Sequence, residues 1–334
     1  MIKKRITISD IAHDAGVSKS TVSRILNGNI PVNQEKVDAV ESAIKRLNYR
    51  PSSLARSLRT QRTLTVGLLI NDIMNPFYSA LARGIEEEAI LAGYSLILCN
   101  TNEDSKRELR YLRTLQDKHV DGVILGPVGN NVDYIANLSR HIPLIQVDRH
   151  INCDNIASVT VDNEQGAYQA TRLLLDKGHR RIAVFTWEQE IATMSQRLTG
   201  YQRAMDEAGL KPDPSDIVRV PRVTQQDAAQ IALEYLQTNT SCTAVFAFNN
   251  QLGLGVLMGS KRLNLNIPQD IALVVFDDLA AFQVTDPPIT VINQPAYEVG
   301  QEAMRQLLKL MNHDVDFTPR GVVIPTELII RQSV

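Results

Sequence analysis

From residue 63 onward, short apolar runs alternate with segments of helical periodicity, and this alternation limits the possible folds more than any other feature of the chain. Short continuous apolar runs are typical of buried strands. The predicted strands lie at 65–70, 94–99, 122–125, 144–147, 181–185, 244–248, 271–276 and 327–331, and the predicted helices at 77–92, 105–118, 163–177, 197–208, 225–237 and 295–311. Strands that alternate with helices favour doubly wound parallel sheets, so we predict an α/β core.

The length of this core predicts two such sheets. About 270 residues accommodate two α/β lobes, and the second lobe is expected to begin near Asp162 and Asn163. Ligands of doubly wound folds bind beyond the carboxyl ends of the strands. A cleft between two lobes is therefore the expected ligand site.

Residues 7–24 have a different pattern, with two short helical segments separated by Gly16. Thr7 and Asp10 have the spacing of a capping box, and Ser18 is placed to cap the second segment. A third helix is expected after Asn33. The buried positions expected in this small bundle are Ile8, Ile11, Ala12, Ala15, Val22, Ile25, Leu26, Val37, Val40, Ile44 and Leu47. Two helices joined by such a turn predict an all-α helix-turn-helix head, whose second helix enters the DNA major groove.

The outer face of the second helix carries Lys19, Ser20 and Arg24. Lys and Arg pair with guanine O6 and N7, and Ser serves several bases. Thr21, Ser23 and Asn27 are better placed for phosphates. The alternative is that each is an ordinary helix surface residue. The DNA-contacting residues that we predict are Thr7, Ser18, Lys19, Ser20, Thr21, Ser23, Arg24, Asn27, Tyr49, Ser52, Ala55, Arg56 and Leu58.

Charge is distributed unevenly between the N-terminal helical segments and the predicted α/β core. Residues 1–62 hold 12 Lys and Arg against 5 Asp and Glu, a net charge of +7. The whole chain has 35 basic and 37 acidic residues, which leaves 23 and 32, or −9, for the remainder. A basic head on an acidic body favours phosphate binding by the head alone. The alternative is a merely solvated basic terminus.

The remaining composition excludes several classes of protein. No apolar run approaches the ~20 residues that span a bilayer, and the N-terminus lacks the apolar stretch of a signal peptide. We therefore expect a cytoplasmic, nucleoid-associated protein with no membrane partner. Cys99, Cys153 and Cys242 are far apart and are expected to be buried thiols rather than disulfides or metal ligands. We predict no metal site and no cofactor.

Three motifs resemble the LacI/GalR family of transcription regulators: VSKSTVSRILNG at 17–28, NYRP at 48–51 and LARSL at 54–58. The resemblance runs over essentially the whole chain. It implies that Lys19, Ser20 and Arg24 read bases and that residues 52–58 form a hinge helix. It further implies that Ala55 lies in the minor groove, where Leu58 wedges into a base step and kinks it. Members bind near-palindromic operators as dimers, so we expect double-stranded operator DNA and a homodimer.

The resemblance also implies a core similar to periplasmic sugar-binding proteins. The domains we predict are 1–50 (the DNA-binding head), 51–62 (the hinge helix and linker) and 63–334 (the effector-binding and dimerisation core). Within the core, the N-lobe would hold 63–161 and 293–322, and the C-lobe 162–292 and 323–334. No long tail follows the last strand, so a dimer is expected rather than a tetramer.

Effector-binding residues follow from the same resemblance. They are Asp72, Phe77, Tyr78, Asp148, Arg149, Arg197, Asn249 and Asp277. Carboxylates and amides bind hydroxyl groups, and aromatic rings cover apolar sugar faces. The alternatives are packing for the two aromatic residues, an ion pair for Arg197, and helix capping for Asn249 and Asp277.

A sugar or sugar derivative is therefore the expected effector, with a purine or nucleoside as the alternative. Arg149 and Arg197 together would suit a sugar acid or sugar phosphate. Two positions depart from the family pattern. Asn250 stands where Asp is usual, which puts an interlobe or structural contact in doubt, and Val275-Phe276 stands where Gly-Tyr is common.

Two other classes of protein compete with a regulator. The glycines of GLGVLMG at 253–259 could indicate a nucleotide-dependent enzyme, but four residues separate them from the preceding strand. A dinucleotide fingerprint needs its first Gly directly after the strand, so we predict that these glycines lie inside a helix. The basic head argues against a sugar-binding or transport protein. The sequence is thus interpreted as an effector-controlled repressor rather than an enzyme.

Overall fold

The computed structural model describes residues 6–26, 33–49, 62–153, 156–189, 191–222, 224–312 and 320–334. The chain divides into two units, residues 1–63 and 64–334. Among the predicted residues, Asn27, Ser52, Ala55, Arg56 and Leu58 lie outside the described ranges.

The first unit is a bundle of three helices, α1 (Ile8–Asp14), α2 (Lys19–Leu26) and α3 (Gln34–Leu47). Its core centres on Ile11, Val22 and Val40, which are fully buried. Gly16 has a φ of +65°, a conformation that glycine adopts without strain and that turns the chain between α1 and α2. The predicted helix-turn-helix head is confirmed.

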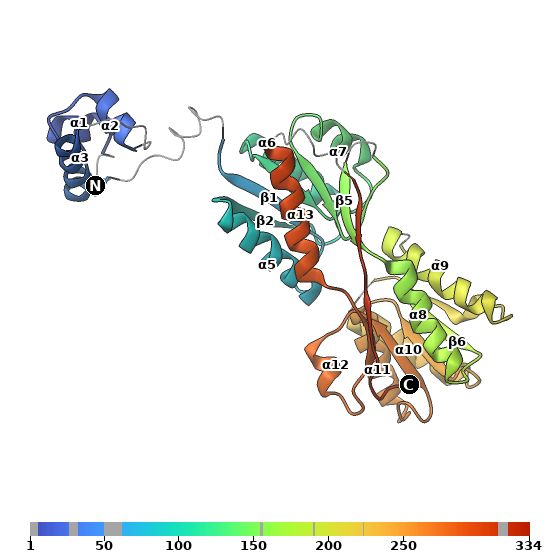
Figure 1. Ribbon diagram of the computed structural model, residues 1–334. Coiled ribbons are helices and arrows are strands. Elements are labelled where there is room, and N and C mark those ends of the chain that lie inside the picture. The colour runs from blue at the N-terminus through green and yellow to red at the C-terminus, as the bar shows by residue number, and fades with distance from the viewer. Residues whose placement is uncertain are drawn as a thin grey trace. The chain divides into compact units, whose positions relative to one another are not determined.

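The second unit contains two six-stranded sheets, each covered by helices (Figure 1). The first sheet has the order β11-β5-β4-β3-β1-β2 and is parallel throughout. Its strands are β1 (Thr65–Ile70), β2 (Ser95–Asn100), β3 (Gly122–Leu125), β4 (Leu144–Val147), β5 (Ala157–Val161) and β11 (Val322–Ile324). Its helices are α5 (Pro76–Leu91), α6 (Ser105–Asp117), α7 (Val132–Leu138) and α13 (Ala296–Met311).

The second sheet has the order β12-β10-β9-β8-β6-β7, with β12 antiparallel to β10 at its edge. Its strands are β6 (Ile182–Trp187), β7 (Ile217–Val220), β8 (Ala244–Ala247), β9 (Ala272–Phe276), β10 (Thr290–Asn293) and β12 (Glu327–Ile329). Its helices are α8 (Asn163–Asp176), α9 (Ala192–Glu207), α10 (Gln225–Thr238), α11 (Asn250–Arg262), α12 (Ala280–Val284) and the 3-10 turn η1 (Pro214–Asp216). The predicted α/β fold class is confirmed.

The chain passes between the two sheets three times, after β5, after β10 and between β11 and β12. The last passage differs from the boundary drawn from the sequence. Val323 and Ile324 pair with Thr160 and Val161 in the first sheet, whereas we expected the C-lobe to begin at Val323. We call the two halves of the core the N-lobe and the C-lobe, by the sheet to which each strand belongs.

Close helix packing holds the N-lobe together at α5 and α13, which lie side by side in Figure 1. A Cβ atom at Gly300 of α13 would come within 2.2 Å of the Leu81 carbonyl oxygen on α5. Glycine is therefore required where these helices cross. The three cysteines, all within the described ranges, form no disulfide, and Cys153 is half-buried rather than buried as expected.

Candidate functional site

Two candidate sites are present, one in each unit, and the first is the outer face of α2. Val22 points into the head's core, which leaves Lys19, Ser20 and Arg24 exposed as predicted. The N-terminal half of a recognition helix is the part that meets base edges. This face presents two cations and a hydroxyl group, a set that can pair with phosphates and guanine.

Hydrogen bonds at the helix starts fix the geometry of this face. Thr7 and Asp10 form the predicted capping box, and the Thr7 hydroxyl donates to Asp10 Oδ2 at 2.7 Å. The Ser18 oxygen accepts the backbone N–H of Thr21 at 3.1 Å. Substituting such a cap by Ala typically costs about 1 kcal/mol of stability. Tyr49, also predicted to contact DNA, is only 9% exposed and packs in the head's core.

The second candidate site is a pocket of about 360 Å³ between the lobes of the core. All eight predicted effector residues line it: Asp72, Phe77, Tyr78, Asp148, Arg149, Arg197, Asn249 and Asp277. Each lies just beyond the carboxyl end of a strand or near the start of a helix that follows one. This placement matches the general rule for ligand sites in parallel α/β sheets. Their roles as ligand contacts remain predictions.

On the N-lobe side, Asp148 and Tyr78 form a buried pair. The Tyr78 hydroxyl donates to Asp148 Oδ2 at 2.9 Å. Burial raises the pKa of the Asp148 carboxyl, although Arg149, Arg197 and the Tyr78 hydroxyl act to lower it. Burial also raises the pKa of Tyr78 well above its usual value, so its hydroxyl stays protonated and donates. A carboxylate fixed in this way is an acceptor for ligand hydroxyl groups.

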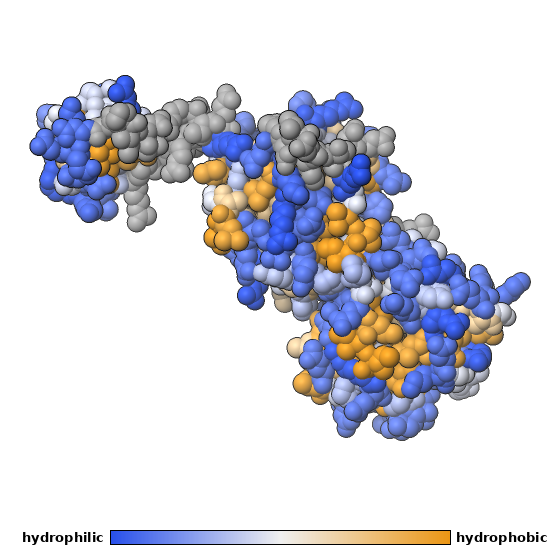
Figure 2. Space-filling model, in the orientation of Figure 1, coloured by the Kyte–Doolittle hydropathy of each residue, from blue (hydrophilic) through white to orange (hydrophobic). Residues whose placement is uncertain are grey.

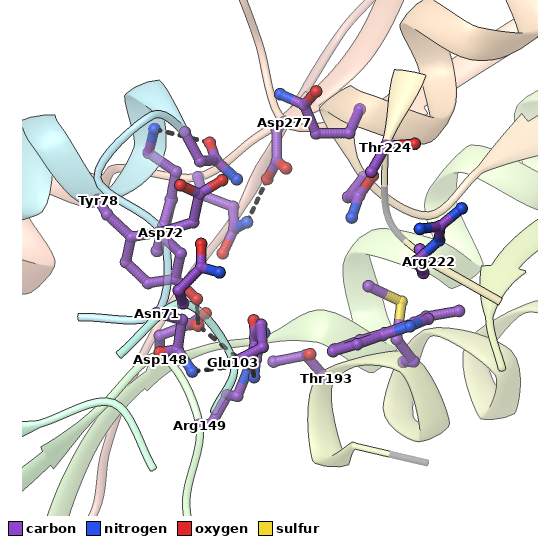
Figure 3. Close-up of a pocket in the computed structure, with 18 of the residues that line it drawn as sticks. Asn71, Asp72, Tyr78, Glu103, Asp148, Arg149, Thr193, Arg222, Thr224 and Asp277 are labelled. Carbon is purple, nitrogen blue, oxygen red and sulfur yellow. Dashed lines mark hydrogen bonds and ion pairs between the residues drawn. The ribbon is translucent and has the colours of Figure 1, made fainter. Parts of the chain in front are cut away.

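Arg149 lies beside this pair, and both arms of its guanidinium group are already bound. Its Nη1 and Nη2 each donate to a carboxylate oxygen of Glu103 at 2.7 Å (Figure 3). Such a bidentate pair is among the strong charge-assisted contacts. The guanidinium carbon also lies 5.8 Å from the centre of the Trp187 ring. Arg149 thus has an internal carboxylate partner, which the sequence did not predict.

Arg197, on α9 of the C-lobe, is likewise held by protein groups. Its Nε donates to Asn163 Oδ1 at 2.8 Å, and its Nη1 donates to the Phe248 carbonyl oxygen. Its guanidinium carbon stacks 3.6 Å from the centre of the Phe276 ring. These partners are neutral, so they do not form the structural ion pair that was the alternative for Arg197. Phe276, which stands where the family commonly has Tyr, thus provides the ring on which Arg197 stacks.

Asp277 and Asn249 complete the C-lobe side. Asp277 Oδ2 accepts the backbone N–H of Asn250 at 3.2 Å, and Oδ1 accepts the side-chain amide of Gln294. Asn249 Oδ1 caps α11 by accepting the Leu252 N–H at 2.8 Å, the capping alternative weighed above. The backbone of Asp277 has a φ of +78°, as Asp148 has +64° in the other lobe. Asp148 and Asp277 are therefore equivalent in the two lobes, each a carboxylate on a left-handed turn directly after a strand.

Several lining residues were missed by the sequence analysis. They are Asn71, Asn75, Asn102, Glu103, Trp187, Thr193, Met194, Pro221, Arg222, Thr224, Gln251 and Gln294. Figure 3 shows Asn71 and Tyr78 on one side of the cavity and Arg222 on the other. Asn71 and Trp187 follow or end predicted strands, which is a signal that could have indicated them. Residues 221–224 and Gln294 follow β7 and β10, which were not predicted as strands.

Other kinds of site find no support in the described parts of the chain. Within them, no three His, Cys, Asp or Glu side chains group as metal ligands would. None of the described helices is long and apolar enough to cross a membrane. The glycines of 253–259 lie inside α11 as predicted, where a Cβ at Gly255 would meet Ala228 of α10 at 2.3 Å. Gly255 and Gly259 let α11 pack on α10, and Gly253 faces Val275 of β9, so these glycines serve packing rather than a nucleotide-binding turn.

Comparisons with known proteins match both parts of the chain to one family. Residues 7–52 match the family of bacterial regulatory proteins of the lacI type, and residues 63–332 match the periplasmic binding proteins and sugar-binding domain of the LacI family. The transcriptional regulator RegA of Clostridium saccharobutylicum is 37% identical over 330 residues, covering 98% of each chain. Catabolite control protein A of Priestia megaterium is 35% identical over 331 residues, covering 98% of this chain and 99% of its own.

A solved structure, described as the transcriptional regulator CelR in complex with cellobiose, is similar over 99% of this chain and 100% of its own. Its TM-score is 0.75 at 29% identity. The chain belongs to the LacI family of bacterial regulatory proteins. It is a DNA-binding transcription regulator and not an enzyme.

Proposed function

We propose that this regulator is a repressor that binds a near-palindromic operator as a homodimer and is controlled by a sugar or sugar derivative in the interlobe pocket. The observation that carries the proposal is the pocket itself. Carboxylates, amides and aromatic rings from both lobes meet around one cavity, a set that suits a polyhydroxy ligand. The regulator bound to cellobiose supports the same class of ligand.

For the DNA side, Lys19, Ser20 and Arg24 read bases, and Thr21, Ser23 and Asn27 hold phosphates. Thr7, Ser18 and Tyr49 are the further DNA contacts that we propose for the head. We propose that residues 51–62 are the hinge helix and linker, with Ala55 in the minor groove, Leu58 wedged into a base step, and Ser52 and Arg56 as further DNA contacts. A Leu58→Gly variant that keeps full operator affinity would rule out the wedge role of that residue. Because operators are in the cytoplasm of bacteria, we place the protein there.

The homodimer is proposed from the family and from apolar surface on the core. Ile90 and Leu91 at the end of α5 are 63% and 83% exposed, and Leu98 on β2 is 39% exposed. Figure 2 shows apolar patches on this unit, one of them where α5 and β2 lie in Figure 1. Exposed apolar groups of this kind mark interfaces. A double variant, Ile90→Lys with Leu91→Lys, should shift the mass measured by light scattering from dimer to monomer.

Control of DNA binding follows from linkage between the two sites. A ligand that prefers one arrangement of the lobes shifts the population toward it, by no more than its difference in affinity for the two. The N-lobes of a dimer then move, and the hinge pairing changes with them.

A thermal-shift screen against sugars, sugar acids, sugar phosphates, nucleosides and purines tests the ligand class. A compound at a hundredfold excess over its Kd stabilises the folded protein by about 2.7 kcal/mol. We expect the hits to be sugars and their derivatives. Hits confined to purines would overturn the proposed effector while leaving the regulator class intact.

A further inference from the structure

Glu103 occupies the position on Arg149 that the carboxylate of an acidic ligand would take. Its two oxygens receive both arms of the guanidinium group at 2.7 Å. The Arg149 side chain is only 10% exposed, and its Nε lies 3.7 Å from Asp148 Oδ2. The cation is thus shared between two protein carboxylates within the pocket.

The local backbone holds Glu103 in this position. Asn102 and Glu103, in the loop after β2, have φ values of +53° and +56°. Consecutive left-handed residues other than glycine are uncommon and cost conformational energy. The Asn71 side-chain amide adds a hydrogen bond of 3.1 Å to Glu103 Oε2. The loop therefore directs the carboxylate into the pocket. A solvated glutamate on the protein surface would not need such support.

The pocket has two other cations in its described lining, and both are bound by protein groups, Arg222 by Asp227 at 3.0 Å. Its described lining has four carboxylates against three guanidinium groups. Arg197 is bound to Asn163 and Phe248 and stacked on Phe276. An anionic ligand would have to displace Glu103 and would lie near Asp148 and Asp277, and like charges at short range in a partly buried site repel strongly.

We propose that Glu103 is a specificity-determining residue that makes the pocket reject anions, so that the effector is a neutral polyhydroxy compound. By occupying Arg149, it removes a guanidinium group that would otherwise bind a carboxylate or phosphate. This inference rests on the proposed function, since it concerns the ligand class of the same pocket. It replaces the acidic-ligand hypothesis that the two arginines suggested in the sequence.

Trp187 offers a direct test, because it is the single tryptophan of the chain and lines the pocket. Its fluorescence would be titrated with D-galactose, D-glucose, D-galacturonate and D-glucuronate, and with sodium acetate against sodium chloride as a minimal carboxylate probe. The titrations would compare wild type with Glu103→Gln, which keeps the size of the side chain and removes its charge. We expect wild type to bind no carboxylate probe better than its neutral counterpart. In Glu103→Gln, the affinity for at least one carboxylate should rise tenfold or more.

Two controls separate the role of Glu103 from general effects. Adding Arg149→Met to Glu103→Gln should abolish the gain, because the gain depends on the freed guanidinium group. Asp133→Asn removes one exposed negative charge from α7 of the same lobe and should leave the carboxylate affinity as in wild type. Melting temperatures show whether each protein is folded. Glu103→Ala is a second variant in which the Glu103 carboxylate is removed.

Either of two results would overturn the proposal: no gain of carboxylate binding in folded Glu103→Gln and Glu103→Ala, or a wild type that prefers the uronates. Neither result involves DNA. A gain in Glu103→Gln together with an operator affinity that no sugar changes would count against the proposed function alone. A sugar-responsive operator without that gain would count against this inference alone.

Discussion

The side-chain amide of Asn250 donates a 2.8 Å hydrogen bond to Asn75 Oδ1 and so joins the two lobes beside the pocket. Asn250 is fully buried at the start of α11, and Asn75 caps α5 by accepting the Phe77 N–H. The family usually has Asp at position 250, which could not donate this bond. The departure noted in the sequence therefore provides an interlobe contact here.

Replacing Asn250 with Ala should weaken ligand binding, because closing the lobes would no longer form this bond. One such hydrogen bond contributes about 1 kcal/mol, or roughly a fivefold change in Kd. Trp187 fluorescence titration with a ligand found in the screen measures the change. Gln269→Ala, at an exposed position of the C-lobe, is the control. An unchanged Kd in Asn250→Ala would show that the contact does not contribute to closure.

Replacing Arg24 with Ala should relax operator specificity at one base position, at a cost of about 1–3 kcal/mol. The exposed guanidinium group on α2 is placed to pair with a base edge. Operator sequences selected from a random DNA library by wild type and by the variant reveal the change. Arg46→Ala is the matched control, since Arg46 pairs with Asp14 within the head at 2.6 Å. If Arg24→Ala weakened all sequences equally, Arg24 would contact only phosphate.

Ligand affinity should fall on acidification at a higher pH than an ordinary aspartate would give. Burial raises the pKa of Asp148, so its carboxylate is protonated sooner as the pH falls and no longer accepts as well. Protein stability should respond in the opposite sense. A raised pKa in the folded state means that this group's contribution to stability is present at low pH and lost as the pH rises through that pKa.

Asp148→Asn tests whether this carboxyl group causes both effects. The pH dependence of ligand binding, measured by Trp187 fluorescence, should flatten at pH values above the usual aspartate range, and the acid limb of the stability profile should change with it. A pH profile identical to that of wild type would mean that another group controls the titration.

Replacing Gly300 with Ala should destabilise the N-lobe, because the added methyl group would meet a backbone oxygen of α5 at 2.2 Å. Overpacking of this kind costs about 1–3 kcal/mol, and more where the backbone must move. Urea unfolding measures the loss. Glu86→Ala, at an exposed position of α5, should stay within about 0.5 kcal/mol of wild type. Equal stability of the two variants would contradict the tight helix crossing.

Much of the fold could be predicted from periodicity, because long apolar strands and helices carry strong signals. The strand predicted at 122–125 coincides with β3, and α13 begins within one residue of its prediction. The strands β5, β7, β10 and β11 were missed. They are short, and β5 and β7 carry polar residues such as Ser158 and Arg219 that break the apolar run. Their place in the sheets comes from pairing with distant strands, which local pattern does not reveal.

The pocket was predicted in outline, because family motifs and strand ends mark its residues. The partners of those residues could not be predicted. Glu103 lies 46 positions from Arg149 along the chain and reaches it through a left-handed loop. Only the fold brings these two charges together. Because the sequence did not reveal Glu103 as the partner of Arg149, the two arginines suggested an acidic ligand. The roles of the DNA-contacting residues remain predictions.

The dissociation constant for a selected operator, measured with and without the sugar that binds at Trp187, tests the central claim most directly. We predict a change of at least fivefold, and linkage requires the operator to change the affinity for the sugar by the same factor. Asp277→Asn, which alters a carboxylate lining the pocket, should reduce both effects together. An operator affinity that is the same with saturating sugar and without it would contradict control of DNA binding through this pocket.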